Sequence, residues 1–290
     1  MKKFYFLILV LLAFMLSAVA QEDMPVVWES KMPHKIDYNG TGTEDRGHSY
    51  AASDKELTVF NNEDGKILWT KSYKELAPKL RKINDLIPFW ESNTIFLFDR
   101  KAGKDQIACV DLETGKLLWN SDKYKNVYEE AVVYVPEEDA FLVSQKDNLF
   151  FIKAHTGEEL WSSTKFRGAV GRYVYLPEKR ELVMVNFIPS GLVSFFTGFK
   201  NQLVRINLKN GDIIWEATYI GRAEKKAYTR EFVYTLDVID DKVILKMNGI
   251  QVYDFNTGAT LWSAAFDFSA DVVKPPSGQI LKYGVYGAVA

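Results

Sequence analysis

The chain has 290 residues, with 36 Lys and Arg against 38 Asp and Glu, which gives a net charge of −2. A protein that binds nucleic acid needs a basic excess on one surface, so this balance argues against a nucleic-acid partner. Cys109 is the only cysteine, which excludes a disulfide framework, and we expect it to be a small buried core residue.

The first twenty residues predict a secretory signal peptide. Lys2 and Lys3 give a basic start, residues 4–16 an apolar stretch too short to span a bilayer, and residues 18–20 a small-residue cleavage site. We therefore expect a mature chain that begins at Gln21 and is exported, to the periplasm or the extracellular space. Without the two lysines it has 34 basic and 38 acidic residues, a net charge of −4. We expect no membrane span after cleavage; an uncleaved anchor is the alternative.

One phrase recurs five times along the chain: a polar turn that ends in glycine, followed four residues later by tryptophan. Short strands in a repeat of about 40–55 residues are typical of propellers. The repeats therefore predict an all-β fold, a beta-propeller of four-stranded antiparallel blades, and we interpret residues 21–290 as one propeller domain. The repeated pairs are Gly65 and Trp69, Gly115 and Trp119, Gly157 and Trp161, Gly211 and Trp215, and Gly258 and Trp262.

Each repeat contains four apolar runs separated by turn residues, which predict four short strands. The turn before the fourth strand needs a residue with positive φ, and glycine takes that conformation without steric cost. We expect each tryptophan to lie on the fourth strand, with its ring buried against the neighbouring blade and its N–H near solvent or a carbonyl. The predicted strands are 86–90, 94–98, 106–110 and 117–120 in the second repeat, 131–135, 140–144, 149–153 and 159–163 in the third, and 232–236, 242–246, 250–255 and 260–264 in the fifth.

Residues 72–83 depart from the strand pattern. Tyr73, Leu76, Leu80 and Ile83 recur at helical spacing, which predicts a short amphipathic helix between two blades. We interpret the helix as a solvated linker. A docking surface formed by its basic side chains is the alternative.

The fourth repeat carries an uncharged insertion, residues 187–199, between its second and third strands. An apolar loop on a propeller rim is either a contact patch for a partner or a cover over the core of its own blade. The sequence leaves both interpretations open, and the insertion is its best candidate for an interaction site. The candidate contact residues are Phe187, Leu192, Phe195, Phe196 and Phe199.

The two ends of the chain resemble parts of one more blade. Residues 25–30, which include Trp28, look like a lone fourth strand, and residues 280–290 look like a first strand. We therefore expect five complete blades plus fragments of another, in a chain truncated at its C-terminus and belonging to a ring of six to eight blades. Direct pairing of the two end segments is the alternative.

The remaining chemistry-bearing residues give weak signals. Spacing of the kind seen around the histidines of the first repeat is not specific for a metal, so we predict no metal site. No serine lies in a nucleophile-elbow pattern, and we predict no catalytic residue. The residues of the weak metal candidate are His34, His48, Asp37, Glu44 and Asp45, and the residues interpreted as solvated turns are His155, Glu129, Glu130, Glu137, Glu138 and Asp139.

The repeated phrase resembles that of the pyrroloquinoline-quinone-like (PQQ-like) repeat propellers, most closely at Asp111, Thr114, Gly115 and Trp119. The resemblance covers residues 26–290. It implies either a quinoprotein dehydrogenase, which binds the quinone and a calcium ion, or a non-catalytic branch that resembles the outer-membrane protein assembly propeller.

The second branch fits the chain better. Cys109 is a lone cysteine, whereas many quinoprotein alcohol dehydrogenases carry an adjacent pair, and no acidic cluster aligns with the calcium site. We therefore expect a non-enzymatic exported propeller without a cofactor, which acts as a protein-binding scaffold in the cell envelope. The alternatives are a PQQ-dependent dehydrogenase-like protein and a carbohydrate-binding or sensor propeller.

Overall fold

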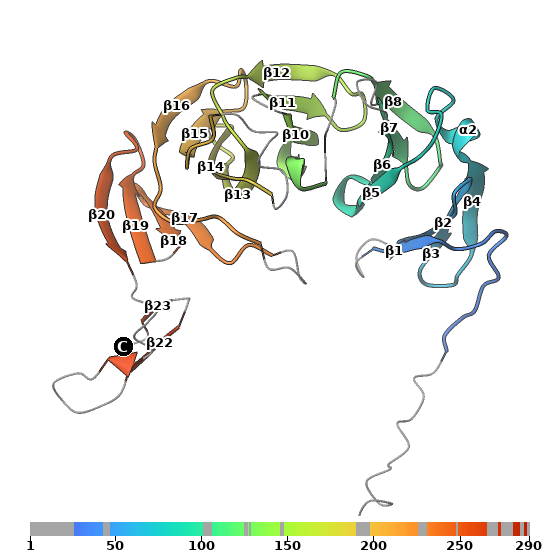
Figure 1. The fold of residues 1–290 in the computed structure, drawn as a ribbon, viewed down its shortest axis with the longest axis horizontal. Helices are drawn as coiled ribbons and strands as arrows, with labels where there is room; N and C mark the ends of the chain where they lie inside the picture. The colour runs from blue at the N-terminus through green and yellow to red at the C-terminus, as the bar shows by residue number, and fades with distance from the viewer. Residues whose placement is uncertain are drawn as a thin grey trace, which may run out of the picture.

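The computed structural model describes residues 26–42, 47–100, 106–124, 127, 129–145, 148–189, 198–225, 231–247, 249–265, 272–273, 281–284 and 287–288. Within them, five antiparallel four-stranded sheets follow one another along the chain. The sheets are arranged around an arc, with the first and the fifth at its two ends (Figure 1). Each sheet is one blade, which confirms the predicted propeller architecture.

The strands of each blade pair in the order in which they follow along the chain, so every blade is a meander. The first blade consists of β1 (Tyr38–Thr41), β2 (His48–Ala52), β3 (Glu56–Asn61) and β4 (Ile67–Ser72), and the second of β5 (Asp85–Phe89), β6 (Thr94–Asp99), β7 (Gln106–Asp111) and β8 (Leu117–Ser121). The third consists of β9 (Val132–Val135), β10 (Ala140–Gln145), β11 (Asn148–Lys153) and β12 (Glu159–Ser163), and the fourth of β13 (Ala169–Leu176), β14 (Glu181–Phe187), β15 (Leu203–Asn207) and β16 (Ile213–Ala217). The fifth consists of β17 (Thr235–Ile239), β18 (Lys242–Lys246), β19 (Gly249–Asp254) and β20 (Thr260–Ala265).

The predicted strands agree with these bounds to within one residue, except for the first strand of the fifth blade. It was predicted at residues 232–236 and is observed three residues later, as β17. The apolar run misled the prediction because Phe232 and Tyr234 fill the core between the fourth and fifth blades before the strand begins.

The predicted helix over residues 72–83 is wrong in its length, because α2 (Tyr73–Leu76) is a single turn. The residue before a proline is disfavoured in the helical conformation. Ala77, which precedes Pro78, accordingly leaves the helix with φ −145° and ψ 78°. Leu76 and Leu80 are nevertheless buried between the first and second blades, so the apolar spacing reflects packing rather than a long helix.

Hydrophobic clusters fill the four spaces between neighbouring blades of the arc. We call the face of a blade that packs on the preceding blade its front face, and the opposite one its back face. Because side chains alternate between the two faces along a strand, each strand contributes to both. The repeated tryptophan lies on the back face; Trp69, for example, packs in the cluster between the first and second blades.

The repeated glycine and tryptophan together make the contact between neighbouring blades. The five glycines have φ between 62° and 75°, and the turns of the second to fifth blades each receive the indole ring of the preceding blade. A Cβ atom added at Gly157 would lie 2.6 Å from the Trp119 ring, so only glycine lets the ring approach this closely. The indole N–H donates to a carbonyl of the next blade at 2.7–2.9 Å: Trp69 to Leu112, Trp119 to Ala154, Trp161 to Leu208 and Trp215 to Phe255.

The N-terminal segment uses the same contact without forming a strand. Residues 26–36 have no regular structure, so the lone fourth strand predicted at residues 25–30 is wrong for its described part. Trp28 nevertheless lies against Gly65, and its N–H donates to the carbonyl of Asn62 at 2.7 Å. It therefore occupies on the first blade the place that the repeat tryptophans occupy on the later blades.

A small sheet follows the fifth blade. It consists of β21 (Val272–Val273), β22 (Leu281–Gly284) and β23 (Gly287–Ala288), paired in chain order and antiparallel. The sequence predicted a first strand at residues 280–290, whereas β22 is a second strand. The actual first strand, β21, has only two residues and is too short to show an alternating pattern.

Cys109 is fully buried, as expected, and burial raises the pKa of its thiol well above the ordinary value. Because only the thiolate reacts readily, we expect a disulfide exchange reagent to modify the folded protein at pH 8 at least about a hundredfold more slowly than the protein unfolded in urea. Absorbance of the released thiol compound measures both rates. Equal rates would show that the strand containing Cys109 opens readily.

Candidate functional site: a cavity on the first blade

The front face of the first blade differs from every other front face of the described blades. Strand pairing places two side chains of the second strand and two of the third strand on each front face. In the first blade these are Ser49, Ala51, Thr58 and Phe60, with two hydroxyl groups. At the equivalent positions, the other blades carry Ile95, Leu97, Ala108 and Val110, then Phe141, Val143, Phe150 and Ile152, then Leu182, Met184, Val204 and Ile206, and finally Val243, Leu245, Gln251 and Tyr253.

The N-terminal segment lies over this polar front face and is fastened to it at two places. The Trp28 ring meets the ring of Phe60 edge-on, with the centroids 5.8 Å apart. Farther along, the Nε2 atom of His34 lies 2.8 Å from the Oγ1 atom of Thr58, and that hydroxyl also meets Thr70 at 2.9 Å. The Thr58 hydroxyl of the face therefore bonds to the segment that covers it.

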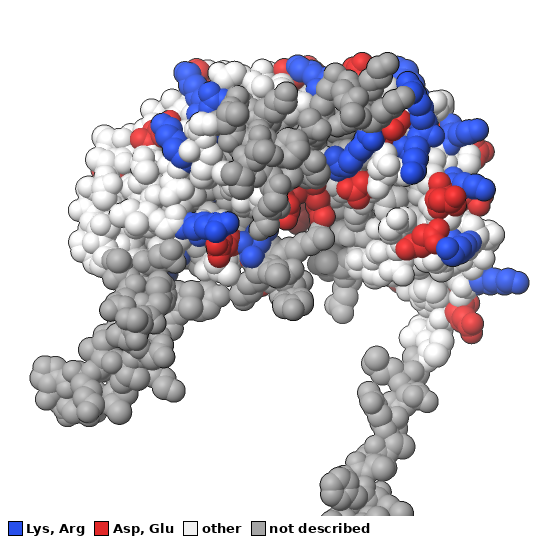
Figure 2. Space-filling model, in the orientation of Figure 1, with Lys and Arg blue, Asp and Glu red and all other residues white. Residues whose placement is uncertain are grey.

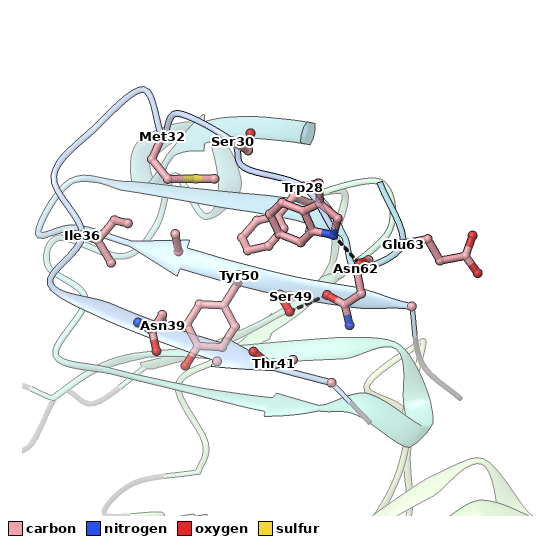
Figure 3. Close-up of a pocket in the computed structure, with 15 residues that line it drawn as sticks. Trp28, Ser30, Met32, Ile36, Asn39, Thr41, Ser49, Tyr50, Asn62 and Glu63 are labelled. Atoms are coloured by element: carbon pink, nitrogen blue, oxygen red, sulfur yellow. Dashed lines mark hydrogen bonds between the residues drawn. The ribbon is translucent and has the colours of Figure 1, made fainter. Parts of the chain in front are cut away.

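A cavity of about 660 Å³ remains between the segment and the blade (Figure 3). On its floor, the Ser49 hydroxyl donates to the Oδ1 atom of Asn62 at 2.5 Å. The volume falls in the range of binding pockets in proteins, and the mixture of aromatic and polar groups suits a ligand with both kinds of surface. The lining residues are Trp28, Ser30, Met32 and Ile36 of the segment, 39–42 and 47 of the first hairpin, Ser49, Ala51 and Phe60 of the front face, Tyr50 of the back face, and 62–63 of the turn.

Gly40 has a packing role in this cavity. The ring of Tyr50 lies against it, and a Cβ atom at residue 40 would overlap the ring. Burial raises the pKa of the Tyr50 hydroxyl above its ordinary value, with a further contribution from Asp85. Tyr50 therefore presents a neutral hydroxyl group beside the cavity at physiological pH.

Exposed apolar side chains occur on the N-terminal segment that covers the cavity. Among the described residues, several of the large apolar side chains that are most exposed belong to this short part of the chain. Exposed apolar groups that gather in one place, with polar groups nearby, are typical of protein-binding surfaces. We call this set the apolar rim; it consists of Val26, Val27 and Ile36.

The predicted interaction residues of the fourth repeat fall into two groups. Phe187 is 3% exposed and belongs to the core between the fourth and fifth blades, with its ring edge-on to Phe232. Phe199 is half-buried beside Gly168, where an added Cβ would lie 2.8 Å from its ring. Leu192, Phe195 and Phe196 lie outside the described residues, and their role as contacts stays a prediction.

The histidines do not gather into one site. His155 lies 3.0 Å from the carboxylate of Asp139, both of them exposed, and His34 bonds to Thr58 as described above. Glu44 and Asp45 lie outside the described residues. Among the residues that the structure does describe, no group of three metal-ligating side chains converges.

Glu138, interpreted from the sequence as a solvated turn residue, is buried instead. Arg180 of the next blade holds both of its oxygens, at 2.9 and 2.5 Å, and the Tyr175 hydroxyl donates to it at 2.9 Å. The carboxylate thus joins the third and fourth blades. No sequence pattern pointed to this pair, because its members lie 42 residues apart in different repeats.

The hydrogen bond from Arg180 lowers the pKa of Glu138 below its ordinary value of 4.5. The ionised form is therefore favoured by folding, and its contribution to stability is present above the unfolded-state pKa and lost as the pH falls through the lower folded-state pKa. We expect Glu138→Gln to lower the urea midpoint at pH 7 and to flatten its decline below about pH 4.5. Glu178→Gln, at an exposed residue of the same region, is the control, and an unchanged pH profile in Glu138→Gln would contradict the assignment.

The chain can now be compared with known proteins. A family model, PQQ_2, described as outer membrane protein assembly factor BamB, matches residues 53–266, well over half of the chain. The chain belongs to this family. The match confirms the resemblance to PQQ-like repeat propellers that the glycine and tryptophan phrase predicted, while no curated protein matches the chain.

Solved structures share the fold at low sequence identity. BamB from Moraxella catarrhalis is 13% identical, with a TM-score of 0.40, over 75% of this chain and 58% of that one. A europium-containing methanol dehydrogenase is also 13% identical, with a TM-score of 0.45, over 82% and 53%. A eukaryotic initiation factor is 10% identical, with a TM-score of 0.50, over 86% and 58%. The chain thus spans a little more than half of the length of these proteins.

Proposed function

We propose that this protein is an exported, non-enzymatic propeller that binds a protein partner in the cell envelope. The observation that carries the proposal is the cavity on the first blade with its apolar rim. The front faces of the second, third and fourth blades are closed by apolar side chains and that of the fifth by apolar side chains and Gln251, whereas polar and aromatic groups of the first blade line a cavity. The family description, an outer membrane protein assembly factor, supports a role in holding other proteins.

The partner that fits this cavity best is an extended peptide segment of another protein. Side chains of such a segment could reach the apolar rim, while its backbone could bond to the amide and hydroxyl groups of Asn39 and Thr41. The rim would supply apolar contact area, and Ile36, which lines the cavity and is 47% exposed, would lose water on binding.

Site-specific crosslinking in living cells tests the proposal. A photoreactive amino acid at Val27 or Ile36 is expected to give a discrete crosslinked protein, identified by mass spectrometry. The same group at Ile214, an exposed apolar residue of β16 on the fourth blade, should not give that product. Identical products at all three positions, or none at Val27 and Ile36, would contradict a contact at the rim.

The insertion of the fourth repeat is proposed as a second contact segment. Changing Phe195, Phe196 and Phe199 to serine should reduce recovery of the same partner if the insertion takes part, and unchanged recovery would eliminate it. Phe187 is left unchanged because it belongs to the core.

Export and the absence of catalysis are tested separately. We propose that residues 1–20 are removed, so N-terminal sequencing of the protein from the cell envelope fraction should begin at Gln21. Among the described residues, no helix has the length and apolar character needed to cross a membrane. Incubation with the quinone and calcium should give neither a bound chromophore nor dye-linked oxidation of alcohols or sugars, and either signal would favour the dehydrogenase alternative.

A further inference from the structure

A second cavity lies between the first and second blades, and we call it the interblade cavity. Its walls are formed by β1 and β2, the turn after β2, the helix α2 and the start of β5. Its volume is about 660 Å³, within the usual range of small-molecule binding sites in proteins. The space between these two blades is therefore large enough to hold a ligand.

Tyr50 brings an unused hydroxyl group to the wall of this cavity. The residue is only 6% exposed, and its hydroxyl group has no hydrogen-bond partner among the described residues. Buried polar groups in proteins nearly always have a partner, because a buried group without one is destabilising. The hydroxyl group of Tyr50 therefore indicates a ligand that completes its hydrogen bond.

The fold does not require a hydroxyl group at this place. Strand pairing gives the other described blades an apolar side chain at the position of Tyr50: Phe96, Leu142, Val183 and Ile244. The residue opposite Tyr50 on the first strand is Gly40, whereas the other blades have Ile87, Val133, Val174 and Asp237 there. The Tyr50 ring lies across Gly40, where a Cβ atom would overlap it (Figure 3). This pair of residues thus brings a hydroxyl group to a position that the other blades use for apolar packing.

The other polar side chains of the interblade cavity include both donors and acceptors. Asn39 and Asp54 line it, and neither side chain has a hydrogen bond within the described part of the chain. Asn84 accepts the backbone N–H of Arg100 at 2.8 Å through its Oδ1 atom, which leaves its amide N–H groups as donors. A ligand that fits must therefore both donate and accept hydrogen bonds.

The carboxylates of the cavity are largely balanced by basic groups. Asp37 lies 2.5 Å from the Nζ atom of Lys35, and Asp85 lies 3.1 Å from the guanidinium group of Arg100. Figure 2 shows acidic and basic side chains close together at this end of the arc. A paired carboxylate attracts a second cation less strongly, but its oxygen atoms keep lone pairs that accept further hydrogen bonds.

An aromatic ring stands at the edge of the cavity. Tyr38 lines it and is 62% exposed, and strand pairing places Tyr38 on the same face as Tyr50. The ring of a tyrosine offers a flat apolar surface together with a polar end. A ligand with one apolar face and polar groups around its edge fits this arrangement.

We infer that the interblade cavity binds a carbohydrate. The C–H face of a sugar ring packs on the ring of Tyr38, and the sugar hydroxyl groups bond to Tyr50, Asn39 and Asp54. Hydroxyl groups donate and accept, whereas an ammonium group only donates and would leave the amide N–H groups of Asn39 and Asn84 unpaired. The inference does not rest on the proposed protein partner.

A printed array of oligosaccharides, followed by calorimetry with the member that binds most tightly, tests the inference on the full chain. Tyr50→Phe removes only the hydroxyl group and is expected to weaken binding about tenfold, and Tyr38→Ala should weaken it by at least as much. Tyr124→Phe, at a buried tyrosine of another core, and Trp262→Ala, at an exposed aromatic residue, are the matched controls. No binding to the array, or equal binding by all four variants, would overturn the inference.

The stability of the ligand-free protein separates a binding role of Tyr50 from a structural one. Tyr50→Phe should leave the urea midpoint unchanged or raise it, because its hydroxyl group has no partner to lose. Tyr73→Phe should lower the midpoint, because the Tyr73 hydroxyl donates to the Ser53 carbonyl at 3.0 Å. An equal decrease in both variants would overturn the inference.

Spermidine identifies the other kind of ligand. Binding of spermidine that weakens as salt is added, without binding of any saccharide, would show a cation site and would overturn the inference. Binding of a saccharide with little dependence on salt supports it. Partner crosslinking at Val27 is independent of these results, because Val27 does not line the interblade cavity.

Discussion

Replacing Trp119 with alanine is expected to lower the free energy of unfolding by about 3–5 kcal/mol, the usual cost of truncating a large buried aromatic side chain. The ring is 9% exposed and lies in the core between the second and third blades. It meets Phe96 edge-on at 5.3 Å and covers Gly157. The substitution would therefore leave a cavity that the flat sheets on either side cannot close.

Loss of the hydrogen bond adds to this cost. The Trp119 N–H donates to the Ala154 carbonyl at 2.7 Å, and a buried hydrogen bond contributes about 0.5–1.5 kcal/mol. Trp119→Phe keeps most of the ring and removes this donor, so it should fall between the wild type and Trp119→Ala. The two variants together separate the packing contribution from the hydrogen bond.

Urea unfolding followed by far-ultraviolet circular dichroism measures the free energy of unfolding of the wild type and of both variants. This signal does not depend on the fluorescence of Trp119, which the variants lack. Ile214→Ala is the control, because Ile214 is an exposed apolar residue on the fourth strand of another blade. It should change the free energy of unfolding by no more than about 0.5 kcal/mol, as is usual for surface sites. A loss of less than about 1 kcal/mol in Trp119→Ala would mean that the tryptophan contact is not a main source of stability.

The sequence was sufficient to predict the blades because their signals are local. The turn glycine and the tryptophan four residues later depend on backbone geometry within a few residues of the chain. The strand bounds of the third repeat could therefore be predicted to within one residue. The predictions failed where a regular spacing of apolar side chains reflects packing between blades rather than a regular helix or strand. Leu76 and Leu80 have helical spacing, but Pro78 stops the helix and both side chains pack between blades.

The candidate site could not be predicted in the same way, because it depends on strand register across different repeats. Ser49 and Thr58 look like ordinary strand residues until pairing places them where the second, third and fourth blades have apolar side chains. His34 lies within hydrogen-bonding distance of Thr58, which is 24 residues away in the chain. Glu138 accepts a hydrogen bond from Arg180, which is 42 residues away. The expected burial of the repeat tryptophan is wrong for Trp262, which is 52% exposed, and its phrase in the sequence gives no sign of this difference from the other four.

The two ends of the arc are chemically unlike each other. The front face of the first blade carries the Thr58 hydroxyl, which already bonds to His34, whereas Trp262 of the fifth blade leaves an apolar ring 52% exposed at the other end.

Replacing Gly211 with alanine is expected to lower the free energy of unfolding by about 2–4 kcal/mol, and two causes contribute. The residue has φ +75°, a left-handed conformation that costs a non-glycine residue roughly 1–2 kcal/mol. The added Cβ would also lie 2.5 Å from the Trp161 ring, and overpacking of this kind typically costs about 1–3 kcal/mol.

Gly198→Ala separates the two causes. Gly198 has φ +62°, but no atom of the described chain lies within 4 Å of the position of its Cβ. It should therefore show the backbone cost alone, about 1–2 kcal/mol, and the difference between the two variants in urea unfolding measures the contact between Trp161 and the turn. Equal losses would mean that the ring moves aside without cost, and that the glycine is needed for its backbone conformation rather than for the docking of the preceding blade.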